Sequence, residues 1–192
     1  MEITVRDALT VVHGMFFGAL LLLAFTGAAV GLYATSASSQ PWMLTPAQRR
    51  FLSMYLAFMA VLAWATVFLG AYAIYPWYRA HAPAGTADLS GYPQRLLISS
   101  PLTTGWHDIG MEWKEHLAWF APICLTAAAA IFAKYGTHLR SLKPLRNALF
   151  GLITLSFLAA SVAGFFGAML NKHAPVRGGA DIVLMDGQSH GR

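Results

Sequence analysis

The residues with the most chemistry to offer lie in one short stretch, residues 105–124, with the sequence GWHDIGMEWKEHLAWFAPIC. Its first dozen residues hold two of the seven histidines and three of the eight carboxylates of the chain: His107, Asp108, Glu112, Glu115 and His116. Imidazole and carboxylate groups transfer protons near neutral pH and bind metal ions. The stretch continues directly into an apolar segment without charges, so ionisable side chains meet a membrane at this point.

The rest of the chain has the composition of a protein that crosses a bilayer. Of its 192 residues, 57% are hydrophobic and 11% are charged, whereas soluble domains carry about 25% charged residues. Asp, Glu, Lys and Arg are missing from residues 8–48, 51–78, 117–133 and 147–171. A helix needs about 20 apolar residues to cross the hydrocarbon core. We therefore predict an all-α integral membrane protein, a bundle of four transmembrane helices over about 8–33, 49–75, 112–134 and 145–170.

The four helices form one domain, residues 1–173, and a polar, glycine-rich tail follows at 174–192. One long loop, residues 79–110, joins the second and third helices. A loop of this length in a compact bundle is usually a functional cover or a binding surface, so we expect other subunits of a membrane complex to dock there. Pro122 predicts a kink in the third helix because it cannot donate to the carbonyl of Ala118.

The distribution of charges predicts the orientation in the membrane. Four crossings put both termini and the long loop on one face and the two short connectors on the other. The connectors carry six cations and no carboxylate: Arg49, Arg50, Lys134, Arg140, Lys143 and Arg146. Because cytoplasmic loops are enriched in Lys and Arg, we predict a multi-pass protein of the cell inner (plasma) membrane with both termini extracytoplasmic. The net charge of +5 then reflects membrane topology and does not indicate nucleic-acid binding.

Histidines gather at the extracytoplasmic face, where each predicted helix has one at or just beyond its end: His13, His81, His116 and His173. Ionisable residues at membrane depth are functional candidates. His13 and His116 are expected at similar depths, so they could be the two axial ligands of one haem b. Glu112 precedes His116 by one helical turn, and it could orient the imidazole or accept a proton from a quinol.

Two other interpretations of these residues stay open. His13 and His116 could be side chains at the membrane interface whose imidazoles are hydrogen-bonded to a carboxylate or to water. Alternatively, His81, His107 and His173 could contribute to a copper, zinc or iron site with carboxylates. The chain has no H-E-x-x-H, G-x-S-x-G, Walker or G-x-G-x-x-G motif, so hydrolase, kinase and nicotinamide chemistry have no support. Cys124 is the only cysteine, which excludes an intrachain disulfide and a cysteine-ligated iron–sulfur cluster.

The helix count and the helix-borne His13 and His116 are similar to small four-helix membrane cytochromes b, which serve larger redox complexes as quinone-reactive or electron-relay anchors. The predicted function is therefore a membrane electron-transfer subunit with one haem b near the outer face, exchanging electrons with quinol or a partner redox protein. A non-catalytic structural or docking subunit is the alternative, and a His/carboxylate copper or iron site is a third. Whether the protein acts as the membrane subunit of a multi-subunit oxidoreductase stays open.

Overall fold

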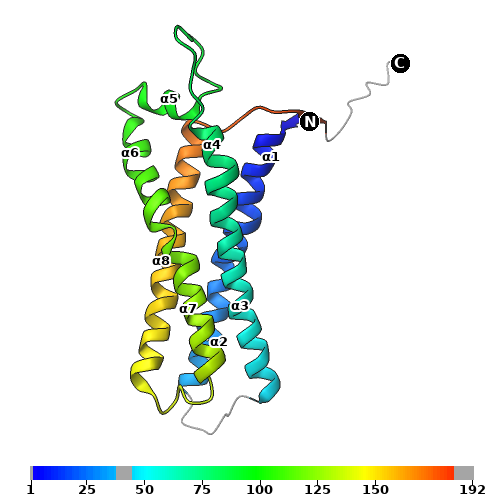
Figure 1. Ribbon diagram of the computed structural model, residues 1–192, viewed down its shortest axis with the longest axis vertical. Coiled ribbons are helices and arrows are strands. Elements are labelled where there is room, and N and C mark those ends of the chain that lie inside the picture. Colours follow the sequence, from blue (N-terminus) through cyan, green and yellow to red (C-terminus); the bar gives the residue numbers. More distant parts are fainter. Residues whose placement is uncertain (1, 38–44, 184–192) are drawn as a thin grey trace, which may run out of the picture.

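The computed structural model describes residues 2–37 and 45–183, and four long helices run side by side through it (Figure 1). The first consists of α1 (Val5–Val11), the π-helical η1 (Val12–Ala19) and α2 (Leu20–Ala37), and the second of α3 (Pro46–Leu69), the π-helical η2 (Gly70–Ile74) and α4 (Tyr75–Tyr78). The third consists of α6 (Thr104–Glu112), the π-helical η3 (Trp113–Leu117) and α7 (Phe120–Tyr135), and the fourth is α8 (Lys143–His173). By length and composition, all four could cross a membrane, so the predicted set of apolar helices is confirmed.

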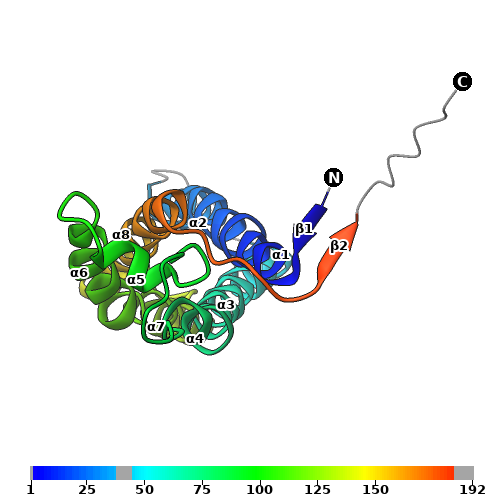
Figure 2. The same cartoon turned by 90° about the horizontal axis from the view of Figure 1, so that it is seen from above.

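Both described chain ends lie at the same end of the bundle, which we call the terminal end (Figure 1). There, β1 (Glu2–Thr4) pairs antiparallel with β2 (Asp181–Val183), and the short α5 (Pro93–Ile98) lies across the helices (Figure 2). At the opposite end, the connector end, α2 meets α3 and α7 meets α8. The common placement of the termini and the long loop is the arrangement that four crossings predict.

The third long helix begins at Thr104 and not near Glu112, so the predicted loop 79–110 contains α5 and most of α6. The reason is packing of α6 against α8. The ring of Trp106 lies 6.1 Å from that of Phe165 and 6.5 Å from that of Phe166, between centroids. A methyl group on Gly110 would approach Phe166 to 3.1 Å, so this glycine permits close contact between helices and does not end one.

The first part of the predicted tail is held against the bundle. Ala174 and Val176 are buried, and the chain then turns through Gly178 and Gly179, both with positive φ, into β2. Glycine adopts this conformation without the strain that a side chain would bring. Residues 184–192 of the predicted tail lie outside the described part of the chain.

The third long helix is interrupted one turn before Pro122, the residue at which the sequence predicts a kink. Helical structure breaks at Ala118 and Trp119, between η3 and α7 (Figure 1). Pro122 has no amide hydrogen to donate to the Ala118 carbonyl. This carbonyl accepts a hydrogen bond from the amide of Ala121 at 3.1 Å instead. The buried hydroxyl of Ser156 in α8 donates to the Ala121 carbonyl at 2.9 Å, so the fourth helix supports the break.

The interior contains two apolar cores. The connector-side core includes Leu56, Met59, Leu125, Phe132 and Leu149. The terminal-side core consists of Tyr78, Leu97, Met111, Leu170, Ala174 and Val176. Large apolar side chains also cover the outside of the helices, among them Leu23, Val30, Phe51, Phe58, Val61 and Leu158. An apolar exterior of this extent fits contact with lipid and not with water.

Candidate functional site

A polar layer lies between the two apolar cores. It contains His13 of η1, Gly70 of η2, Lys114 of η3 and Gly167 of α8. Three of the four long helices are π-helical at this level. Because a π-helical segment adds a residue to the turn and often marks a functional position in a helix, the layer is the first candidate for a site.

His13 presents a nitrogen without a partner to this layer. Its imidazole packs against Gly70, where a methyl group would come within 2.8 Å of Cε1, and a ring N–H donates to the backbone carbonyl of Thr66. Its Nδ1 is buried and has no hydrogen-bond partner among the described residues. More than 90% of buried polar groups are paired. The exception at His13 therefore calls for a ligand, an ion or water at this nitrogen.

Lys114 places a cation in the same layer. Its Nζ lies 3.1 Å from the position that a Cβ on Gly167 would occupy, the residue is half-buried, and it is close enough to His13 to interact electrostatically. In the described part of the chain, the one ion pair within 4.0 Å joins His116 to Glu112, so no carboxylate neutralises Lys114 there. Because burying an unpaired charge costs several kcal/mol, this position favours a complementary ligand.

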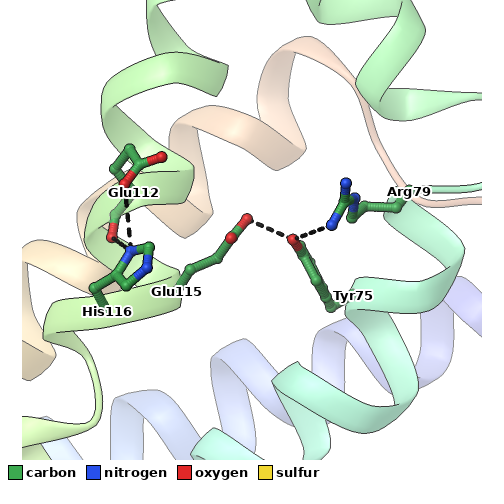
Figure 3. A network of polar contacts seen from close by, with 5 residues as sticks. All are labelled: Tyr75, Arg79, Glu112, Glu115 and His116. Atoms are coloured by element: carbon green, nitrogen blue, oxygen red, sulfur yellow. Dashed lines mark hydrogen bonds and ion pairs between the residues drawn. The ribbon is translucent and has the colours of Figure 1, made fainter.

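A second cluster of polar side chains, contributed by the second and third long helices, lies beside this layer (Figure 3). The hydroxyl of Tyr75 donates to the Glu115 carboxylate at 2.6 Å. Arg79 donates from Nη1 to the same hydroxyl oxygen at 3.0 Å, and its guanidinium lies 5.4 Å from the Tyr75 ring centroid. Such charge-assisted bonds are short and strong, so they fix a carboxylate inside the bundle.

Polar and aromatic contacts continue from Tyr75 toward the terminal end. The Tyr75 and Tyr78 rings stack with centroids 6.4 Å apart. The Tyr78 hydroxyl is bonded to His107 Nδ1 at 2.7 Å, and Gln94 of α5 lies 3.4 Å from the other ring nitrogen of His107. This series of side-chain contacts, from Glu115 through Tyr75, Tyr78 and His107 to α5, therefore connects the interior with the terminal end.

Glu112 and His116 lie on the outside of the third long helix. Their side chains are 75% and 68% exposed, and they form an ion pair of 3.3 Å within one helix. Figure 3 shows both turned away from Glu115, which points to Tyr75. His13 thus lies inside the bundle and His116 outside it, and the structure does not bring these two predicted axial ligands together. Haem binding by this pair stays a prediction.

The weaker metal candidates are also placed apart. His81 is exposed in the loop, His107 is bonded to Tyr78, and His173 stacks on Trp106 with ring centroids 6.0 Å apart. Across residues 2–37 and 45–183, no group of three or more His, Cys, Asp or Glu side chains is arranged to hold a metal ion. A copper, zinc or iron site at these histidines also stays a prediction.

Lys114, Tyr75 and Arg79 are site residues that the sequence analysis does not single out. A signal for Lys114 exists, because it follows Gly110 and Met111 by four and three residues and so shares their helix face. Gly110 and Met111 are a small and an apolar residue, which in the sequence is compatible with a face that packs against a neighbouring helix. Tyr75 and Arg79 belong to an aromatic cluster that is equally typical of a membrane interface.

Comparisons with family models, with curated protein sequences and with solved structures find no match to this chain. The fold and the site alone therefore define the class. They define a four-helix protein, apolar and long enough to cross a membrane four times, with a polar layer near one end of the bundle.

The Tyr75–Glu115 bond is expected to contribute to stability. Tyr75→Phe leaves the Glu115 carboxylate without this donor and should lower the free energy of unfolding by about 1–3 kcal/mol. Tyr72→Phe is the matched control, since Tyr72 is 73% exposed, and it should change stability by less than about 0.5 kcal/mol. Denaturant unfolding in detergent micelles measures both. The double variant Tyr75→Phe/Glu115→Gln should cost less than the sum of the single changes, and strict additivity would contradict a direct interaction.

Proposed function

We propose that the protein is a membrane electron-transfer subunit that exchanges electrons and protons with quinol at the terminal-end border of the bilayer. The observation that carries the proposal is the 2.6 Å bond between Tyr75 and Glu115, which holds a carboxylate between helices next to a polar layer. Carboxylates at membrane depth are costly and typically mark proton or substrate paths.

The depth of the layer supports contact with a lipid-soluble substrate. Gly70 lies 20 residues after Arg50, Lys114 lies 20 residues before Lys134, and Gly167 lies 21 residues after Arg146. At 1.5 Å per residue these distances are about 30 Å, which is the thickness of the hydrocarbon core. If the connector cations stand at the cytoplasmic border, the polar layer stands at the extracytoplasmic border of an inner (plasma) membrane.

Quinol oxidation needs a base as well as an electron acceptor, because each quinol releases two protons with two electrons. Glu115 is the carboxylate placed to take such a proton, and Tyr75, Tyr78 and His107 lie between it and the terminal end. Glu112, the sequence-based candidate, is 75% exposed on the other side of its helix. We therefore assign the role of proton acceptor to Glu115.

The electron carrier next to this site is either a haem b or a redox partner. His13 and His116 are the residues that would hold a haem, which would supply one-electron chemistry. The second predicted ligand, His116, does not face His13. The proposal does not depend on the pair, since a partner redox protein can also take the electrons.

Replacing the proposed proton acceptor tests the function. In the affinity-purified full-length protein with its native partners, Glu115→Gln should lower the rate of decylquinol oxidation by ferricyanide about 100-fold, the usual size of a general-base effect. Glu112→Gln is the control and should leave the rate within about twofold. Wild-type protein that does not oxidise decylquinol, or equal losses in both variants, would overturn the proposal.

An optical spectrum tests the haem prediction separately. If haem b is bound by both histidines, a reduced-minus-oxidised spectrum shows its bands, and His13→Ala and His116→Ala each abolish them. Bands that survive His116→Ala contradict the pair. Colourless protein contradicts haem binding altogether.

Docking of a partner subunit at the terminal end is a second candidate function. Ile98, Leu102 and Ile109 are 37%, 90% and 64% exposed where α5 leads into α6. Large apolar side chains exposed together mark interaction surfaces, and these lie at and beyond the terminal end of the predicted crossing. We propose that this surface binds another subunit of a membrane complex.

This docking proposal predicts that Leu102→Asp dissociates the native complex. The change puts a charge into the interface, which is costly without a partner. Native electrophoresis of solubilised membranes would then show the tagged protein shifted from a larger complex to its own mass. Leu142→Asp, at a 41% exposed leucine of the connector end, should not shift it. An unchanged complex in the Leu102 variant would show that the surface is not needed.

A further inference from the structure

The polar layer contains two hydrogen-bonding groups that the proposed proton acceptor does not use. Lys114 has no carboxylate within 4.0 Å among the described residues, and the buried Nδ1 of His13 has no partner there. The Glu115 carboxylate next to Lys114 in sequence is directed to Tyr75. An ammonium and an imidazole without an acid complement a ligand whose oxygen is an acceptor or carries negative charge.

We infer that Lys114 and His13 bind the head-group oxygen of the quinone or quinol, an inference that rests on the proposed function. The Lys114 ammonium can donate to a quinone carbonyl and more strongly to an anionic quinol oxygen. One ring N–H of His13 donates to the backbone of Thr66, so the unpartnered Nδ1 of the neutral imidazole can accept from a quinol hydroxyl. The two side chains therefore serve both redox states of the same ligand.

Glycines give this pair its place between the helices. Gly167 lets the Lys114 ammonium approach α8, and Gly70 lets the imidazole of His13 lie against η2. Side chains at these two positions would occupy the space that the ammonium and the imidazole now take. Lys114 and Glu115 are consecutive in η3, so a head group bound at Lys114 is near the carboxylate that takes its proton.

Calorimetric titration of the full-length protein in detergent with decylubiquinone and with its quinol tests the inference. Lys114→Met keeps the length of the side chain and removes its donors, and His13→Phe keeps a ring without nitrogen. Lys114→Met should weaken the binding of both forms, and His13→Phe that of the quinol, about 10-fold or more, as expected for a lost hydrogen bond to a charged or buried group. Lys172→Met, at an exposed lysine of α8, should leave affinity unchanged. Lys114→Gln keeps a donor and should recover part of the affinity.

Folding of the variants is checked by thermal unfolding without ligand. Lys114→Met should unfold at the wild-type temperature or above it, because replacing a half-buried charge that has no counter-charge by an apolar side chain is neutral or stabilising. Lys114→Gln serves as the test variant if Lys114→Met does not fold, and its affinity should then lie below that of the wild type.

Each result has a distinct meaning. Quinone binding that persists in Lys114→Met and disappears in Glu115→Gln would overturn the inference and leave the proposed function standing. Wild-type protein that does not bind decylubiquinone would overturn both. Stabilisation by acetate or phosphate that depends on Lys114, without quinone binding, would show an anion site instead. A haem b spectrum that His13→Phe abolishes would assign the imidazole to iron and also overturn the inference.

Discussion

The organisation of this bundle depends on the cost of placing a charge where water is scarce. Lys114 lies inside four apolar helices, next to Gly167, and no described carboxylate forms an ion pair with it. Lys114 is half-buried, and an ammonium that loses part of its hydration without gaining a counter-charge is destabilising. The surrounding structure accommodates it between two apolar cores, at the one level where three helices leave α geometry.

The departures from α geometry explain how polar groups reach this level. A π-helical turn contains about one residue more than an α turn, so it rotates the following side chains around the helix axis. If η3 were α-helical, the side chains after Leu117 would point in a different direction around the helix axis relative to the side chains before Trp113. Within and just before η3, Glu115 faces Tyr75 while Glu112 and His116 face outward (Figure 3).

Two clusters of polar side chains lie between the helices, and under the proposed function they would have different roles. Lys114 and the unpartnered nitrogen of His13 offer hydrogen bonds to a ligand, whereas Tyr75 connects the Glu115 carboxylate to the Arg79 guanidinium. His107, in α6, connects α4 to α5 through Tyr78 and Gln94. The loop between the second and third long helices therefore extends the polar route and covers the end of the bundle.

Length and hydrophobicity determined the four helices, because hydrocarbon thickness sets how many consecutive apolar residues a crossing helix needs. They also predicted the common end of the termini. The break at Ala118 and Trp119 lies one turn before Pro122, which lacks the amide hydrogen that the Ala118 carbonyl would accept. The first residue of the third long helix could not be predicted from length and hydrophobicity. Gly105 and Gly110 have the composition of a loop, and only the contact of α6 with Phe165 and Phe166 shows that they are helical.

By itself, the sequence determined which residue types gather at one end of the bundle, and the tertiary structure decided which of them face each other. In a soluble helix the polar face identifies the exterior. Here lipid and protein core are both apolar, so the sequence pattern gives no direct measure of helix rotation. Packing and the π-helical turns set that rotation, and they place His13, Lys114 and Glu115 inside while Glu112 and His116 lie outside.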